Sequence, residues 1–345
     1  MVLGGNHSFF GTDCAITLGK LTGVKTQAGE FRMARQGKLA VVFPGQGSQR
    51  PGMGKDFYDQ IPACRETYEE ASEALGWDVA ALCFGEDERL NLTEFTQPCI
   101  VTTEVAMMRG LKSRYDFSPF YFGGHSLGEF TALVAADVLP LADVVRIVHK
   151  RGRLMQEAMP VGVGAMTAVI GEKLDIQEIL NTLSDLPIDV ANVNSAKQVV
   201  ISGEARFMPE AESRLAETLS HDQSVRFVQL NVSAPFHSRF MSPIEESFED
   251  TLRAFQAGMV VENVTGVTSN FTGGFHADDQ NEIIRNLVLQ LSNTVKWMEN
   301  MTELSSQAEK IYEVGPGRPL RAFFQSMEVD CSSVTALSAA ERLFH

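Results

Sequence analysis

Ser126 lies in the run GGHSLGEF, residues 123–130, between glycines and directly after a histidine. Residues 124–128 fit G-x-S-x-G, the pattern of a serine nucleophile on a sharp turn between a strand and a helix. Such a serine projects its hydroxyl at the N-terminus of the helix, where the helix dipole favours developing negative charge. The pattern therefore indicates covalent acyl chemistry, provided that its flanks form that strand and that helix.

A serine nucleophile needs a base to take its proton. His237, in SAPFHSRFM, follows a proline and opens a helix-like segment, so a loop can present its side chain. His125 adjoins Ser126, and we expect it to point away from the turn. His149 lies in the middle of a helical pattern, and we expect it to face solvent. We therefore predict His237 as the base.

The flanking sequence supplies the elements that the turn requires. An aromatic run before residue 124 is typical of a strand, and the Ala/Leu/Val segment after residue 128 is typical of an amphipathic helix. KLAVVFPGQG, residues 38–47, predicts a second buried strand that enters a glycine-rich loop. Further helices are predicted over 61–76, 97–114, 140–158 and 280–292, and strands near 259–268 and over 311–314, before a terminal helix. Strands that alternate with helices predict a mainly parallel α/β sheet.

The pattern changes after residue 162. Strands are predicted over 163–171, within 188–203 (two) and over 224–232, with helices over 173–184 and 207–220 between them. This order, β-α-β-β-α-β, is that of a ferredoxin-like unit. We therefore predict an α/β protein with a large domain at 37–160 and 232–330, an inserted small domain at 161–231, and a partly disordered N-terminal extension at 1–36.

Composition limits the partners and the compartment. The chain has 345 residues, 44% hydrophobic, and a formal net charge of −15, which argues against a nucleic-acid partner. No apolar run is long enough for a membrane span, and the first residues lack a secretory pattern. Five scattered cysteines without a CxxC pair predict reduced thiols in the cytoplasm. The histidines show no metal-ligand spacing, so we expect no metal.

Five motifs occur in a fixed order along the chain: FPGQGSQ (43–49), GHSLGEF (124–130), RGRLMQEA (151–158), APFHS (234–238) and EVGPG (313–317). Together they resemble the malonyl-CoA:acyl-carrier-protein transacylase family, which includes the acyltransferase domains of polyketide synthases. The resemblance covers about residues 38–325. It implies an α/β-hydrolase-like large domain with an inserted ferredoxin-like small domain, in agreement with the organisation predicted above.

The resemblance also implies roles for individual residues. Ser126 matches the nucleophile that carries the acyl group, and His237 matches the general base and acid. In this family a main-chain carbonyl, matched here by that of Gln290, holds the imidazole in place of a third acidic side chain. The oxyanion hole is implied to consist of the N–H groups of Gln46 and Leu127.

Two further residues bear on the substrate. Arg151 matches an arginine that holds the free carboxylate of a malonyl-type group, although a solvated helix arginine is the ordinary alternative. A guanidinium fork suits a carboxylate and stays charged when buried. Phe236 precedes His237, and the resemblance implies that a phenylalanine there goes with malonyl and a smaller residue with methylmalonyl. The physical cause is that a bulky ring would clash with a branch. Plain core packing is the alternative for Phe236.

The resemblance implies a transferase that moves malonyl from CoA, through an acyl-serine, to the phosphopantetheine thiol of an acyl carrier protein, in fatty-acid or polyketide synthesis. No cofactor is implied, and we expect a monomer. The alternatives are a trans-acting acyl hydrolase, a polyketide acyltransferase for another acyl group, a non-catalytic relative, and a general esterase. An acidic carrier would need a local basic patch on this acidic protein. The candidates are Lys150, Arg153, Arg239, Lys296 and Arg318.

Overall fold

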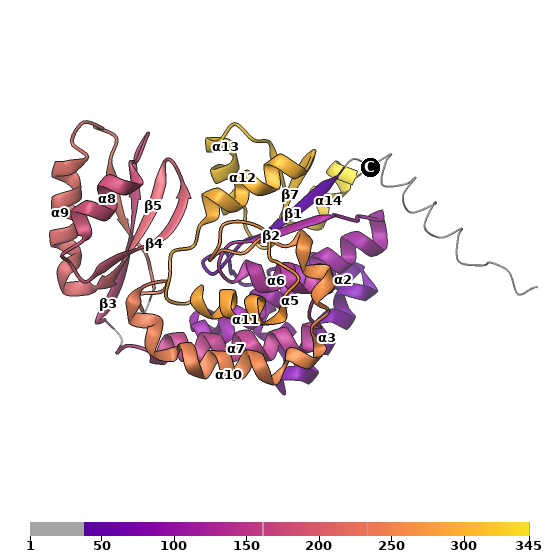
Figure 1. Cartoon of the computed structure of the whole chain (residues 1–345). Helices are drawn as coiled ribbons and strands as arrows, with labels where there is room; N and C mark the ends of the chain where they lie inside the picture. The colour runs from indigo at the N-terminus through magenta and orange to yellow at the C-terminus, as the bar shows by residue number, and fades with distance from the viewer. Residues whose placement is uncertain (1–37, 161, 233, 345) are drawn as a thin grey trace, which may run out of the picture. The chain divides into compact units, whose positions relative to one another are not determined.

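The computed structural model describes residues 38–160, 162–232 and 234–344. The extension predicted at 1–36 lies outside the described residues. The described elements form two separate four-stranded sheets with helices packed against them (Figure 1). The predicted α/β fold class is therefore confirmed.

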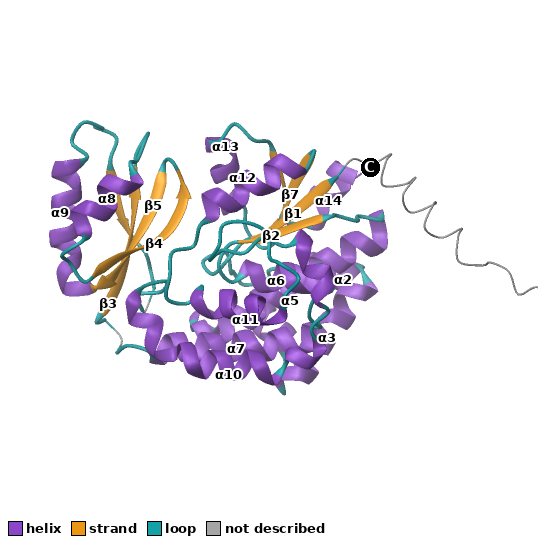
Figure 2. Cartoon of the chain, viewed as in Figure 1, coloured by secondary structure: helices purple, strands orange, loops and turns teal. Residues whose placement is uncertain are grey.

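The first sheet is parallel throughout, in the order β2–β1–β7–β8. Figure 2 shows β2, β1 and β7 next to one another. Its strands are β1 (Leu39–Phe43), β2 (Tyr121–Gly124), β7 (Lys310–Val314) and β8 (Cys331–Val334). Successive side chains of a strand point to opposite faces. Accordingly, Val41 and Phe43 enter one hydrophobic core, and Ala40 and Val42 enter another. Because both faces of β1 are buried, its sequence is a continuous apolar run.

Helices cover both faces of this sheet. The larger layer comprises α2 (Lys55–Gln60), α3 (Pro62–Leu75), α4 (Val79–Phe84), α5 (Thr93–Tyr115), α6 (Gly128–Ala135), α7 (Leu141–Glu157), α10 (Glu245–Ala254), α11 (Gln280–Leu289) and α14 (Leu337–Phe344). The opposite face is covered by α12 (Trp297–Gln307) and α13 (Pro319–Ser326) (Figure 1). The rings of Trp297 and Phe324 on these helices are fully buried.

The second sheet is antiparallel, in the order β4–β5–β3–β6. Its elements are β3 (Gly164–Ile170), α8 (Ile176–Leu183), β4 (Ile188–Ser195), β5 (Gln198–Glu204), α9 (Met208–Thr218) and β6 (Arg226–Gln229). They follow the β-α-β-β-α-β order and lie within the range predicted for the inserted domain. Both helices pack on one face of the sheet and share with it a separate hydrophobic core (Figure 2).

Two details differ from the sequence predictions. The strand predicted near 259–268 is wrong, because Val261–Gly266 forms a 3₁₀ helix and is followed by isolated bridges alone, from Val267 to Phe122 and from Thr268 to Phe275. Asn263 and Gly266 interrupt that apolar run, and both residue types are depleted in strands. The end predicted for the large domain at residue 330 is also wrong, since β8 lies beyond it and pairs with β7.

The parallel sheet fixes where the site forms. The registers Phe43↔Gly124 and Val42↔Glu313 bring the carboxyl ends of β1, β2 and β7 to one edge. Ligands in open α/β sheets bind outside this edge. The glycine-rich loop after β1 and Ser126 after β2 therefore emerge side by side, although more than 70 residues separate them in the sequence.

Candidate active site

A cavity of about 1040 Å³ lies between the two sheets. The large domain contributes the loop after β1, the Ser126 turn, α7 and residues 316–320. The small domain contributes side chains of β3 to β6, among them Met166, Asn192, Val200 and Val228. Ser126, His237, Arg151, Phe236, Gln46 and Leu127 all line this one cavity.

The turn at Ser126 is held in a strained conformation. The residue has φ 52°, in the left-handed region that non-glycine residues rarely adopt. The turn fits because a Cβ at Gly124 would overlap the main chain of Gly128, and a Cβ at Gly128 would overlap the Phe43 carbonyl. The N–H of Ser126 donates to Oδ1 of Asn270 at 2.6 Å, which fixes the turn from a distant loop.

His237 is hydrogen-bonded on both sides. Its Nε2 lies 2.7 Å from Oγ of Ser126, and its Nδ1 lies 2.7 Å from the main-chain oxygen of Gln290. A carbonyl only accepts, so Nδ1 carries the proton and Nε2 is free to accept from the serine hydroxyl. Gln290 follows the last residue of α11, where helix carbonyls have no intrahelical partner.

Burial is the main cause that lowers the pKa of His237 from 6.5 to about 3, and the positive charge of Arg151 lowers it further. The hydrogen bond to the Gln290 carbonyl opposes both effects. The imidazole is therefore neutral near pH 7, as a general base must be.

Arg151 is 1% exposed and lies on the inner face of α7. Val144, Val148 and Met155 share this face, because side chains three and four residues apart lie on one side of a helix. Lys150 is half-buried and Arg153 exposed on other faces of the helix. Of these three cations on α7, Arg151 is thus the one on the buried face.

Among the residues that the structure describes, the hydrogen-bond partners of the Arg151 guanidinium are all neutral. It donates to Oε1 of Gln97 at 3.0 Å, to Oε1 of Gln290 at 2.8 Å and to Oγ of Ser126 at 3.2 Å. Within residues 38–160, 162–232 and 234–344, its Nε has no partner. Burial lowers the pKa of Arg151 to about 10, so the group stays charged near pH 7. A buried cation without a carboxylate partner is suited to an anionic ligand.

Two N–H groups at the cavity are free for an oxyanion. In the described part of the chain, neither the Gln46 N–H nor the Leu127 N–H has a hydrogen-bond acceptor. Leu127 precedes the first residue of α6, where helix N–H groups lack intrahelical partners. The side chain of Gln46 donates to Oγ1 of Thr93 at 3.1 Å, which ties its loop to α5.

Neither of the other two histidines considered as the base, His125 and His149, forms a hydrogen bond with Ser126 in the described ranges. Nε2 of His125 lies 2.8 Å from Oδ1 of Asn194 in the small domain. His149 faces solvent only in part, because its side chain is 30% exposed and lies 3.3 Å from Glu94. Trp77 and Phe95 flank its ring.

Several polar residues at the site had no role in the sequence analysis: Gln97, Glu129, Asn270 and His276. Each is at least 97% buried and hydrogen-bonded to the residues above or to one another. A buried polar residue on an apolar helix face, such as Gln97 in FTQPCIV, is a signal that could have indicated one of them.

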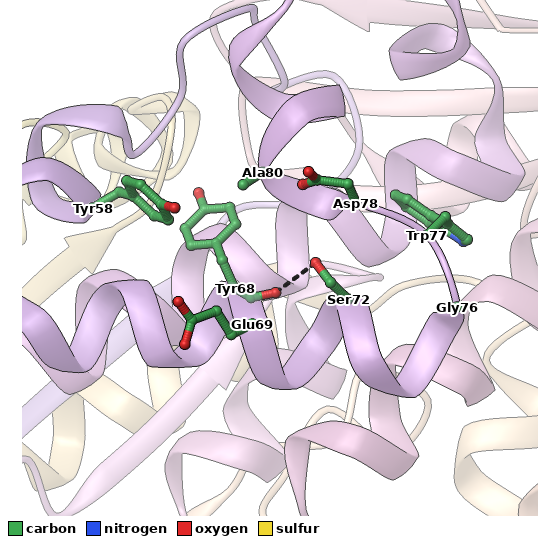
Figure 3. A pocket seen from close by; sticks show the side chains of 8 residues that line it. All are labelled: Tyr58, Tyr68, Glu69, Ser72, Gly76, Trp77, Asp78 and Ala80. Carbon is green, nitrogen blue, oxygen red and sulfur yellow. Dashed lines mark hydrogen bonds between the residues drawn. The ribbon is translucent and has the colours of Figure 1, made fainter.

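A second hollow of about 430 Å³ lies on the helical layer between α2, α3 and α4 (Figure 3). Tyr58, Tyr68 and Trp77 line it together with Glu69 and Asp78, and it contains none of the site residues.

In the described ranges, no cluster of His, Cys, Asp or Glu could hold a metal ion. No helix among them is long and apolar enough to cross a membrane.

Known proteins resemble this chain in sequence and in structure. The acyl transferase domain family model matches residues 40–316. A malonyl CoA-acyl carrier protein transacylase from Staphylococcus aureus is 36% identical over 303 residues, which cover 85% of this chain and 93% of that protein.

The solved structure of a malonyl CoA-acyl carrier protein transacylase from Clostridium perfringens is 34% identical, with a TM-score of 0.80 over 88% of this chain and 95% of that one. The malonyl-transacylase PlMCAT, solved with a type II PKS acyl-carrier protein, is 33% identical, with a TM-score of 0.80 over 89% of this chain and 99% of that one. The chain therefore belongs to the malonyl CoA-acyl carrier protein transacylase family of acyl transferases.

Proposed function

We propose that this protein transfers a malonyl group from CoA to the phosphopantetheine thiol of an acyl carrier protein through an ester of Ser126. The observation that carries the proposal is the buried guanidinium of Arg151, which lies 3.2 Å from the serine hydroxyl and bonds none of the described carboxylates. An acyl group that reacts at Ser126 while Arg151 binds its carboxylate must carry that carboxylate close to the reacting carbonyl. A malonyl thioester, with one CH₂ between the two groups, meets this requirement.

The reaction proceeds in two balanced steps. Nε2 of His237 takes the hydroxyl proton as Oγ of Ser126 attacks the thioester carbonyl, and the oxyanion lies between the N–H groups of Gln46 and Leu127. CoA leaves as a thiol with the proton from His237. The carrier thiol then gives its proton to His237 and attacks the ester, and the proton returns to Ser126 as the malonyl thioester of the carrier is released.

Intact-mass analysis after mixing with malonyl-CoA or acetyl-CoA tests the proposal. We expect a malonyl adduct that is absent from Ser126→Ala and that passes to a phosphopantetheinylated carrier. Arg151→Ala should reduce malonyl loading on the order of 100-fold, because a charge-assisted paired contact is lost, and should reduce acetyl loading much less. Arg153→Ala, an exposed arginine two residues away, is the matched control. Equal loading of acetyl and malonyl groups by the wild type would refute the carboxylate clamp, and rapid loss of the adduct to water would favour the hydrolase alternative.

Selectivity for malonyl over methylmalonyl is part of the proposal and depends on Phe236. The ring is 7% exposed and belongs to the wall of the main cavity, directly before His237 in the sequence. A methyl branch on the acyl group would have to displace this ring.

The carrier is proposed to dock at the mouth of the cavity through positive charge. Arg318 is exposed, lines the cavity and forms no ion pair with any described residue, whereas Arg239 is engaged by Asp189. Arg318→Glu should raise the KM for the carrier about tenfold through charge repulsion. Arg65→Glu, on α3 and outside the cavity lining, should leave it unchanged. An unaltered KM in Arg318→Glu would remove this residue from the docking site.

We also propose a monomer in the cytoplasm. The large exposed hydrophobic side chains among the described residues come from separate segments: Leu92, Phe120, Val163, Leu180, Val228, Val260 and Leu343. A stable dimer would need a contiguous apolar surface. The four described cysteines, at positions 64, 83, 99 and 331, are buried and free, which supports a reducing compartment.

A further inference from the structure

A network of fully buried polar groups centred on Glu129 adjoins Ser126 and His237. We call it the Glu129 network, and its other members are Asn270, His276 and Gln290. Glu129 is in the first turn of α6, three positions after Ser126, and its side chain is 0% exposed. Oε2 accepts from Nε2 of Gln290 at 2.7 Å and from the main-chain N–H of Asn270 at 3.0 Å. Oε1 lies 2.9 Å from Nε2 of His276.

Gln290 connects Glu129 to Arg151, His237 and Ser126 through hydrogen bonds. Its Oε1 accepts from Arg151, its Nε2 also donates to the main-chain oxygen of Ser126 at 3.0 Å, and its own main-chain oxygen accepts from His237. The side-chain amide of Gln290 can bond both Glu129 and Arg151 in one orientation only, because a carboxylate can only accept and a guanidinium can only donate. Glu129 therefore fixes the orientation in which Gln290 offers its oxygen to Arg151.

A single loop contacts Glu129 at two points. Asn270 and His276 are six residues apart, and the antiparallel bridge Thr268↔Phe275 closes the loop between them. Asn270 carries the Oδ1 that accepts the N–H of Ser126. The contacts to Glu129 thus hold both the nucleophile turn and the Gln290 side chain.

His276, like Glu129, makes no side-chain hydrogen bond to Ser126, His237 or Arg151 in the described ranges, and the one partner of its side chain there is Glu129. Its side chain is 0% exposed, and its Nδ1 has no partner among the described residues. Nε2 is thus its one hydrogen-bonding nitrogen, and it must donate because the carboxylate accepts. A buried imidazole with one unsatisfied nitrogen is costly, which argues that its donor serves a purpose other than packing.

We propose that Glu129 and His276 are positioning residues for the transfer reaction, which fix Gln290 and Asn270 and, through them, His237, Arg151 and Ser126. This inference rests on the proposed function. It assigns to the pair an effect on rate and on the choice of acyl group, because Arg151 is among the groups that it positions.

The experiment compares four variants by active-site titration and single-turnover loading. His276→Leu removes the donor at similar volume. His276→Gln keeps an N–H donor near the position of Nε2. Glu129→Gln removes the accepting carboxylate that His276 and Gln290 share, and we expect it to behave like His276→Leu. Glu104→Gln is the matched control for it, since Glu104 is also a fully buried glutamate, bonds Oγ1 of Thr131 alone among the described residues and has its pKa raised by burial.

We expect His276→Leu to load malonyl about tenfold more slowly per titrated site, with a lower malonyl-to-acetyl ratio, because charge-assisted hydrogen bonds around Glu129 are weakened. His276→Gln should recover most of the rate and the ratio, and Glu104→Gln should match the wild type in both. His276→Met, which also lacks a donor and fits irregular space, replaces the leucine variant if the latter does not fold.

A purely structural role predicts a different result. Fewer sites would then titrate, but each would load at the wild-type rate with the wild-type ratio, and that result would overturn the inference. The proposed function fails separately, if the wild type itself forms no malonyl-serine. Loss of rate in His276→Gln equal to that in His276→Leu would also overturn the inference, because the donor would then have no effect.

Discussion

Arg151 and His237 share one hydroxyl: Oγ of Ser126 lies 3.2 Å from Nη2 of Arg151 and 2.7 Å from Nε2 of His237. The charge of Arg151 lowers the pKa of His237, because it disfavours the imidazolium. A carboxylate bound to Arg151, as proposed above, would cancel that effect. We therefore expect an anionic acyl group to make His237 more basic as it binds.

Removal of the cation should raise the pKa of His237. In Arg151→Ala we expect that pKa to rise above about 3 and to stay below 6.5, since burial is the larger cause of the shift and persists. An NMR titration of the imidazole measures it. Arg153→Ala, with its exposed side chain, should leave the value unchanged. A pKa that stays at or below the wild-type value in Arg151→Ala would contradict the coupling.

Acid should destabilise the protein through His237. The pKa is lower in the folded state, so the unfolded chain binds more protons between pH 6.5 and about 3. The contribution of the neutral imidazole to stability is fully present above pH 6.5 and is lost as the pH falls through this window. Within this window, the free energy of unfolding of the wild type should therefore fall by about 1.4 kcal/mol more per pH unit than that of His237→Gln.

Denaturant unfolding at pH 6, 5 and 4 measures this difference. Glu313 acts in the opposite sense, because burial raises its pKa to about 7, and its contribution is lost as the pH rises. Both proteins contain Glu313, so the difference between them isolates His237. Parallel stability curves for the two proteins would contradict the prediction.

A smaller residue at position 236 should admit a branched acyl group. Phe236→Ser removes a ring from the cavity wall, and one methyl group in an apolar pocket is worth about 1–3 kcal/mol of discrimination. We expect the preference for malonyl over methylmalonyl to fall by about tenfold or more. Competition between the two CoA thioesters, read by intact mass, checks it. An unchanged preference would leave Phe236 with a packing role alone.

The turn at Ser126 should not tolerate a side chain at Gly124. In Gly124→Ala the new methyl group would meet the Gly128 main chain, so the strand and helix must separate. We expect loss of malonyl loading together with a lower melting temperature. Gly274→Ala, where a Cβ would meet nothing within 4 Å, is the control. Full activity in Gly124→Ala would show that the close approach is dispensable.

The sequence predicted the elements that local periodicity encodes. β1, β2 and α7 have continuous apolar or amphipathic patterns, and the structure contains each of them. The prediction of a strand near 259–268 was wrong because Asn263 and Gly266 break the apolar run, which forms a 3₁₀ helix instead. β8 was missed because CSSV is short and half polar, and its strand character comes from pairing with β7.

The roles carried by motifs could be predicted, and the contacts between distant segments could not. Ser126, Arg151 and His237 each lie in a recognisable run, and the structure brings them together. Their roles in the reaction remain predictions. Glu129 lies within GHSLGEF, yet its partners are 141, 147 and 161 residues away, at positions 270, 276 and 290. No local pattern encodes such contacts, because they depend on tertiary packing.

The dependence of the Ser126 turn on residues 237, 270 and 290 has a consequence for synthesis. The turn is translated when less than half of the chain exists. The residues that bond its hydroxyl as a base (His237), its N–H (Asn270) and its main-chain oxygen (Gln290) emerge more than 100 residues later, although Arg151 follows after 25. At about 5–20 residues per second, the nascent chain contains Ser126 without these three partners for several seconds or longer. A ribosome-bound fragment that ends before residue 290 should consume no CoA thioester. Catalysis is thus withheld until the protein is nearly complete.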